Sequence, residues 1–341
     1  MKTTRIFNDA LLNPLRQTGD PAADLVVETL AQAGGRAVLG ELMRYLADNQ
    51  NLNFEQQPVV VQDFLRLNSQ FPAWTDSKKM AAGLAFFWKN ASSIALTLGC
   101  YSLPYCYAGA DGAQVLWLSQ RIKDDTFKRL EETGEFLFGI MQERDWPNQR
   151  NFVKILKIRL MHAVIRYFTA YAPQWNTAWG TPINQEDMAG TNLAFSYIVV
   201  RGLRKLSIKT TQVEEESYLH LWKTLGFVMG VSPELLPENL LEAYHLDRAI
   251  AKRQFKPSEA GRGLTLALLK TLEKQVPSPT FKDLPAAQMR FLLGNDMADL
   301  LGLPAVALEM KLIEATTLPI FPKTIFQNAA PSSSALGKYL R

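Results

Sequence analysis

Apolar residues recur three and four positions apart along almost the whole chain, and this period limits the fold more than any other feature. Such spacing places apolar side chains on one face of an α-helix. Regular strand alternation followed by hairpin turns is almost absent. We therefore predict an all-α fold, with a Pro- and Gly-containing loop over 101–114. The predicted helices span 20–32, 34–48, 58–71, 75–98, 115–122, 124–142, 151–171, 185–206, 213–230, 232–255, 258–276 and 283–303.

The chain has 341 residues, of which 47% are hydrophobic, so it can bury a large core. It shows no repeat of fixed period and no long linker. We predict one helical domain over 1–328. Residues 329–341 are small and polar, which is typical of a flexible tail.

Charge and hydropathy exclude several classes of protein. The net charge is +4 and the basic residues form no block, which argues against nucleic-acid binding. The longest apolar stretch, 80–100, is interrupted by Lys89 and Asn90. A bilayer span needs about 20 mostly apolar residues, so we predict a buried helix here. The N-terminus has no apolar run after its charges, so the expected location is cytoplasmic.

Common catalytic and metal-binding motifs are missing. The sequence has no HExxH, no paired Glu-x-x-His, no GxSxG, no P-loop and no GxGxxG. Cys100 and Cys106 are not in a zinc-type spacing, and packed reduced thiols are favoured over a disulfide. His220 is predicted in an amphipathic helix, packed or exposed, and His245 on a solvated face.

The stretch RLMHAVIRYF carries the remaining histidine, and two interpretations of it stay open. Helical spacing aligns Arg159, His162 and Arg166 in one stripe on an otherwise apolar helix. Buried arginines need anions. One interpretation is a satisfied core histidine with two surface arginines. The other is haem b, whose iron would bind the imidazole and whose two propionates would bind the guanidinium groups.

The sequence also resembles the DUF2236 family, which includes the bacterial latex-clearing rubber oxygenases and the fungal MpaB-type oxygenases. The resemblance extends over most of the chain. Its most specific pieces are RLEETGEFLFGIM, KIRLMHAVIR and GTPINQEDMAGTNLAFSYIVVRGLRKL, in this order. It implies a globin-like haem-binding core with additional helices, and His162 as the ligand of the haem b iron.

The resemblance also implies a distal helix with Arg and Thr four apart, which matches Arg129 and Thr133. Both would lie on one helical face, where they could polarise oxygen. Latex-clearing proteins carry a lysine just before that threonine, whereas this sequence has Glu132. Lysine capping of the iron from this position is therefore excluded. Glu132 is a candidate base for an allylic proton, with a solvated carboxylate as the alternative.

Two further features have both a structural and a functional interpretation. Asn184 and Asp187 resemble a capping box, and this structural role is favoured over one in which Asp187 and Thr191 orient neighbouring helices around a haem. Arg290 matches a family arginine on an apolar face, and it would pair with a propionate or with an interhelical carboxylate.

The resemblance implies a haem b-dependent oxygenase that uses O₂ to oxidise or cleave a C=C bond. The expected substrate is a small hydrophobic molecule of isoprenoid type, because no export signal directs the chain to extracellular rubber. The alternatives are a haem oxidase or monooxygenase that acts on a small metabolite without cleavage, a non-catalytic haem sensor or carrier, and a helical lipid-binding protein without haem. The sequence does not indicate an oligomeric state.

Overall fold

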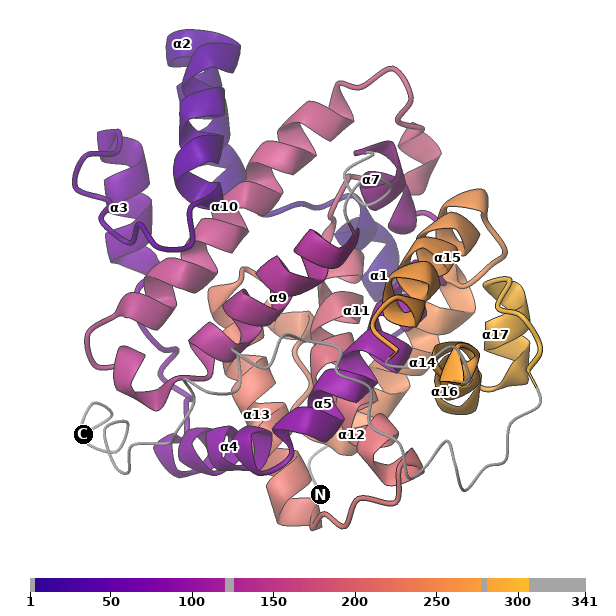
Figure 1. Ribbon diagram of the computed structural model, residues 1–341. Helices are drawn as coiled ribbons and strands as arrows, with labels where there is room; N and C mark the ends of the chain where they lie inside the picture. The colour runs from indigo at the N-terminus through magenta and orange to yellow at the C-terminus, as the bar shows by residue number, and fades with distance from the viewer. Residues whose placement is uncertain (1–3, 120–125, 277–280, 307–341) are drawn as a thin grey trace.

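The computed structural model describes residues 4–119, 126–276 and 281–306, and these residues form helices without strands (Figure 1). The all-α prediction is therefore confirmed. The predicted tail at 329–341 lies outside the described residues. The helices are α1 (Asp9–Arg16), α2 (Pro21–Ala47), α3 (Val59–Asn68), α4 (Ser77–Lys89), α5 (Ala91–Thr97), α6 (Leu103–Tyr107), α7 (Ala113–Leu118), α9 (Thr126–Ile140), α10 (Arg150–Ala170), α11 (Gln185–Phe195), α12 (Tyr197–Lys205), α13 (Gln212–Val228), α14 (Leu240–Gln254), α15 (Glu259–Glu273), α16 (Leu284–Leu293) and α17 (Asn295–Leu300).

Helix α10 crosses the molecule and packs against α2, α3, α9 and α13 (Figure 1). Eleven of its 21 residues are buried, including Phe152, Leu156 and Leu160. A helix buried on several sides is nearly apolar all round, which explains why its polar residues stand out in the sequence. Among the described residues, no helix is both long and apolar enough to cross a bilayer.

Helix α2 folds back on itself at Gly35, whose φ of 61° and ψ of −147° interrupt the helical backbone. Asp20, before its first half, bonds to Arg159, and Asp48, after its second half, bonds to Lys157. Because those two partners are only two residues apart on α10, the halves must run antiparallel. The separate helices predicted over 20–32 and 34–48 thus form a hairpin whose bend protrudes from the molecule (Figure 1).

Several predicted boundaries are wrong, each for a local reason. The helix predicted over 75–98 is interrupted at Asn90, whose side-chain amide donates to the carbonyl of Phe86. The helix predicted over 185–206 breaks at Ser196, where φ is −107° and ψ is −83°. The loop predicted over 101–114 contains α6, because Pro104 lies in the first turn, where a helix tolerates proline.

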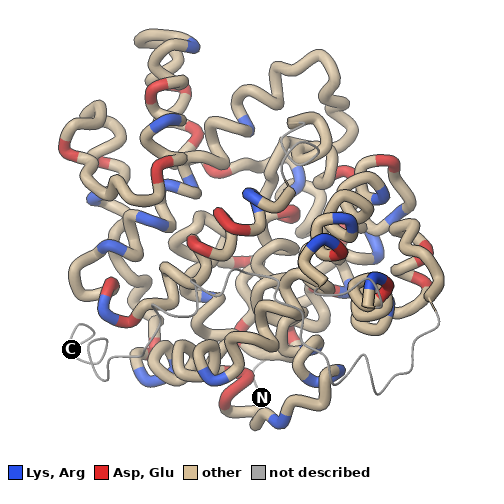
Figure 2. The backbone as a smooth tube through the Cα atoms, viewed as in Figure 1, with Lys and Arg blue, Asp and Glu red and all other residues tan. Residues whose placement is uncertain are grey.

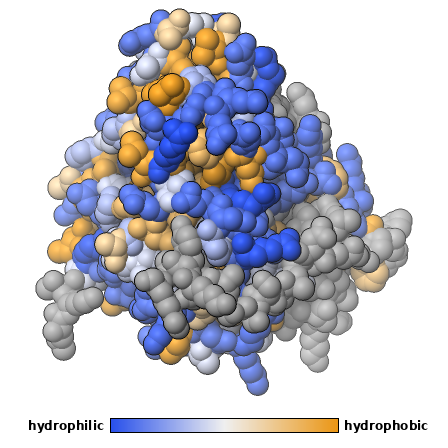
Figure 3. All heavy atoms as spheres, turned by 90° about the vertical axis from the view of Figure 1, so that its left-hand side faces the viewer, coloured by the Kyte–Doolittle hydropathy of each residue, from blue (hydrophilic) through white to orange (hydrophobic). Residues whose placement is uncertain are grey.

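The surface carries acidic and basic residues interspersed along the chain (Figure 2). The face with α2 and α3 shows apolar residues scattered among hydrophilic ones (Figure 3). Exposed residues such as Leu25, Val59 and Leu67 contribute apolar surface of this kind. Cys100 and Cys106 are free thiols, as predicted.

Candidate functional site

His162 lies in the middle of α10 with an unsatisfied imidazole. Its Nδ1 atom is buried, and no described residue forms a hydrogen bond with it. Burial lowers the pKa of His162 to about 4, and the positive charges of Arg166 and Arg129 act in the same direction. The ring is therefore neutral near pH 7, with a lone pair available to a ligand. A buried polar atom without a partner costs about 1–3 kcal/mol, so this ring calls for a partner outside the chain.

The guanidinium of Arg129, on α9, also has no polar partner among the described residues. Its side chain is half-buried, and none of the described residues lies within hydrogen-bonding or ion-pairing distance of its guanidinium. Its charge acts on His162 and on the buried Tyr107 of α6. Helices α6, α9 and α10 therefore bring a phenol, a guanidinium and an imidazole near one another.

Thr133 and Glu132 accompany Arg129 on α9. The Thr133 hydroxyl donates to the Arg129 carbonyl at 2.7 Å, so its proton is engaged within the helix while its oxygen can still accept. Glu132 is half-buried, and its carboxylate has no partner among the described residues. The roles predicted for these two residues in catalysis stay predictions.

Arg159 and Arg166 form ion pairs with carboxylates of the protein itself. Arg159 Nε donates to Asp20 Oδ2 at 2.5 Å and Arg159 Nη2 to Asp20 Oδ1 at 2.9 Å, a two-pronged ion pair. Arg166 bonds to the carboxylate of Asp24 and to the carbonyl of Pro182. The expected anions are thus carboxylates of the N-terminal hairpin, and binding of propionates by these arginines stays a prediction.

Neither carboxylate is predicted from the sequence as a site residue. Asp20 is also the N-cap of α2, since it accepts a hydrogen bond from the amide of Ala23. Asp24 lies four residues later, on the same face of α2. The i, i+4 spacing was visible in the sequence, but nothing in it indicated a partner about 140 residues away.

Asp187 belongs to a charged cluster beside the site. Asn184 caps α11 and also donates to Asp187 Oδ2 at 2.8 Å, so the structural role predicted for this pair is present. Arg16 Nη1 donates to Asp187 Oδ1 at 3.0 Å. Burial nevertheless raises the pKa of Asp187 to about 6, against the opposing effect of Arg16. Its carboxyl group therefore titrates close to neutral pH.

Arg290 pairs with an interhelical carboxylate. Its Nη2 atom lies 2.8 Å from Asp299 Oδ1 of α17, and its Nη1 atom donates to the carbonyl of Leu303. Of the two partners considered for Arg290, the structure contains the carboxylate. The contact fastens α17 to α16 across the bend at Gly294, where φ is 86°.

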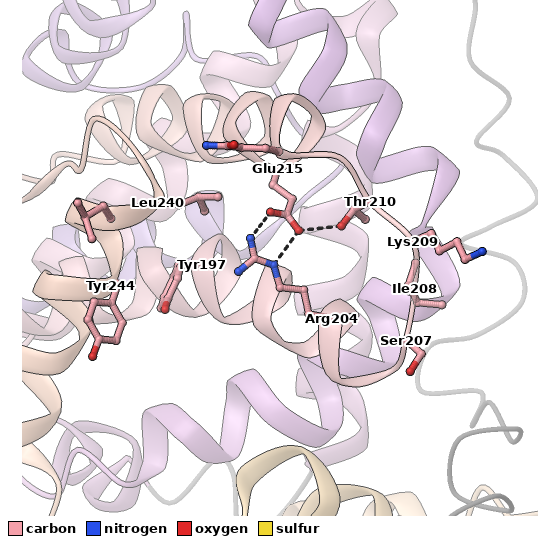
Figure 4. Close-up of a pocket in the computed structure, with 11 residues that line it drawn as sticks. Tyr197, Arg204, Ser207, Ile208, Lys209, Thr210, Glu215, Leu240 and Tyr244 are labelled. Atoms are coloured by element: carbon pink, nitrogen blue, oxygen red, sulfur yellow. Dashed lines mark hydrogen bonds and ion pairs between the residues drawn. The ribbon is translucent and has the colours of Figure 1, made fainter.

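A surface cleft of about 930 Å³ lies elsewhere, between α12, α13 and α14 (Figure 4). Its buried carboxylate, Glu215, is already satisfied by Arg204 and by the Thr210 hydroxyl at 2.7 Å. No residue of the predicted site lines it. We therefore place the candidate site at His162 and not in this cleft. The cleft is lined by Tyr197, Arg204, Ser207, Ile208, Lys209, Thr210, Gln212, Glu215, Leu240, Leu241 and Tyr244.

The single imidazole of His162 fits a metal ion whose other ligands come mostly from a cofactor. In the described part of the chain, no three His, Cys, Asp or Glu side chains lie together as a metal site would require. A single neutral imidazole is enough for a porphyrin-bound iron, because the macrocycle supplies the other nitrogen ligands. The chemistry of the residues is therefore compatible with haem b.

Two known proteins are similar to this chain. A rubber oxygenase of Streptomyces sp. (strain K30) is 22% identical over 305 residues, which cover 88% of this chain and 74% of that protein. The solved structure of latex clearing protein LCP in the closed state matches with a TM-score of 0.71 at 20% identity, covering 95% of this chain and 90% of that one. This likeness shows a shared fold.

The model of one family matches residues 88–317, which is more than half of the chain and includes His162 and Arg129. The family is described as ER-bound oxygenase mpaB/B'/Rubber oxygenase, catalytic domain. The resemblance noted in the sequence is therefore confirmed. The chain belongs to the family of mpaB and rubber oxygenase catalytic domains.

Proposed function

We propose that the protein is a haem b-dependent oxygenase that uses O₂ to oxidise or cleave a C=C bond in a hydrophobic, isoprenoid-like substrate. The observation that carries the proposal is the half-buried imidazole of His162, whose buried Nδ1 atom has no partner among the described residues, within the part of the chain that matches an oxygenase family. Haem, when bound, would supply the iron that activates O₂.

The side chains of this protein would divide the remaining tasks. His162 would hold the iron, since its low pKa keeps the ring neutral throughout the physiological range. Arg129 would supply a positive charge to developing negative charge, because no protein anion neutralises its guanidinium in the described structure. Thr133 would orient oxygen or substrate through its hydroxyl oxygen.

Glu132 would accept a proton from an allylic carbon of the substrate at its carboxylate oxygen. Its half-buried position and unpartnered carboxylate support this role. The substrate class follows from the family and from the relative named a rubber oxygenase. An unsaturated hydrocarbon would bind by apolar contact, so its placement would depend on the shape of the pocket.

The first test is the visible spectrum of the purified protein after addition of haem. We expect a Soret band that His162→Ala abolishes or shifts. His245→Ala is the matched control, because His245 is exposed on α14 and should leave the band unchanged. An identical band in the wild type and in His162→Ala would remove His162 as the ligand.

The second test measures the reaction. Oxygen consumption with polyprenols and shorter terpenoids, followed by mass spectrometry, would identify the substrate and products. A pair of carbonyl products would support cleavage, whereas addition of a single oxygen atom would support a monooxygenase. Haem binding without oxygen consumption on any such substrate would instead favour a sensor or carrier.

A further inference from the structure

We propose that Asp20 and Asp24 are positioning residues of the His162 site, because they hold the two arginines that flank the imidazole on α10. The inference rests on the proposed function, since it assigns these carboxylates a task relative to a haem ligand. It also extends the site to the N-terminal hairpin, which lies before the family match at 88–317.

The two ion pairs follow the same order along both helices, because Asp20 pairs with Arg159 and Asp24 pairs with Arg166. Asp20 and Asp24 are four residues apart, and Arg159 and Arg166 are seven apart, so each pair occupies one helical face. His162 lies between the two arginines. Two ion pairs, one on either side of the ring along α10, limit both sliding and rotation of this helix against α2.

The Asp20–Arg159 contact is desolvated and the Asp24–Arg166 contact is partly desolvated, so both constrain position. The side chains of Arg159 and Asp20 are 10% and 4% exposed, and those of Arg166 and Asp24 are 5% and 24% exposed. A charge that loses its partner in such a place is costly, so α10 cannot move away from the hairpin without a large penalty. Direct two-pronged bonding by Arg159 adds a fixed geometry.

Each guanidinium is also held on its other side by backbone. Arg159 Nη1 donates to the carbonyl of Val228 at 3.2 Å, and Arg166 Nη2 donates to that of Ile183 at 2.9 Å. Glycines make these approaches possible. A Cβ atom on Gly230 would lie 2.5 Å from Arg159 Nε, and one on Gly19 would lie 2.6 Å from Arg166 Nε. The arginines thus have little freedom to shift.

The two carboxylates also balance charge beside the ring. Without them, Arg159 and Arg166 would place two uncompensated positive charges next to the imidazole. Positive charge near a haem iron favours the ferrous over the ferric state, because the ferric state carries one more positive charge. The midpoint potential of the bound haem therefore reports whether the carboxylates act on the site.

The experiment uses the full-length protein loaded with haem and four variants. Asp20→Asn and Asp24→Asn remove one negative charge each, and Asp24→Glu restores it. Asp145→Asn is the matched control, because Asp145 pairs at 2.7 Å with Lys154, also on α10, away from the arginine stripe.

We expect Asp20→Asn and Asp24→Asn to raise the midpoint potential and to speed transfer of haem to apomyoglobin at least about tenfold, in line with the effect of residues that orient a metal ligand. Asp145→Asn should leave both unchanged, and Asp24→Glu should restore most of the wild-type behaviour. Equal potentials and equal transfer rates in all variants would overturn the inference.

Two further measurements distinguish failure of this inference from failure of a variant to fold and from failure of the proposed function. If Asp24→Asn does not fold, the double variant Asp24→Asn with Arg166→Met takes its place. It removes both charges of the ion pair, so no lone charge is left buried. The double variant should still lose haem faster than Asp145→Asn. If the wild type binds no haem, the proposed function fails. Amide hydrogen exchange of the apoprotein then tests the positioning role by itself. The amides of residues 155–166 should exchange faster in Asp20→Asn than in the wild type, but not in Asp145→Asn. Equal exchange in all three proteins refutes the positioning role.

Discussion

Lys157 offers a sharp quantitative test of how α10 is anchored to the hairpin. The residue is 2% exposed, and its ammonium group donates to the carbonyls of Asp48 and Asn51, each at 2.7 Å. It also lies 4.2 Å from the centre of the Tyr45 ring. Burial lowers the pKa of Lys157 from its ordinary 10.5 to about 8, only partly opposed by Asp48.

The sign of the effect on stability follows from the two pKa values. Between pH 8 and 10.5 the unfolded chain binds more protons at this lysine than the folded protein does, so the free energy of unfolding rises with pH. At 1.36 kcal/mol per pKa unit, the gain reaches about 3 kcal/mol by pH 10. The gain is lost again as the pH falls from 10.5 to 8.

Lys157→Met removes this titration while keeping a side chain of similar length. Urea unfolding of both proteins at pH 6, 7, 8, 9 and 10, followed by circular dichroism, gives the difference in the free energy of unfolding. We expect that difference to be constant below about pH 7 and then to shift in favour of the wild type by about 3 kcal/mol at pH 10. Parallel pH profiles would show that the pKa of Lys157 is the same in the folded and unfolded chain, and would refute the predicted lowering by burial.

Three other outcomes follow from the structure. Burial raises the pKa of Asp187 from 3.8 to about 6 in the folded protein. The free energy of unfolding of the wild type should therefore fall by about 3 kcal/mol relative to that of Asp187→Asn as the pH rises from 3.5 to 7. Urea unfolding across that pH range measures this difference. Gly230→Ala should cost about 2 kcal/mol or more, because φ is +87° and the new Cβ would press on Arg159; a melting temperature equal to that of the wild type contradicts this. Arg129→Leu should keep or raise the melting temperature, since no described residue pairs with the guanidinium, while substrate-dependent oxygen consumption falls at least tenfold; retained consumption would exclude Arg129 from the reaction.

Local sequence patterns were sufficient for most elements of the fold and for the position of the key imidazole. The 3.6-residue period identified α9 and α10, and the Asp20 and Asn184 caps mark real helix starts. Boundaries were less accurate, because a break such as that at Ser196 depends on how two helices pack against their neighbours rather than on a proline or glycine.

The sequence alone determined an all-helical chain with one histidine set between two arginines on an apolar helix, because helix formation and facing depend on residues only three or four positions apart. Only the tertiary structure decided that those arginines are neutralised by Asp20 and Asp24, and that His162 Nδ1 and the Arg129 guanidinium have no partner among the described residues. Such pairings join residues up to 142 positions apart, and no local period reports them. They depend on the bend at Gly35 and on the packing of α2 against α10, which bring the charges together.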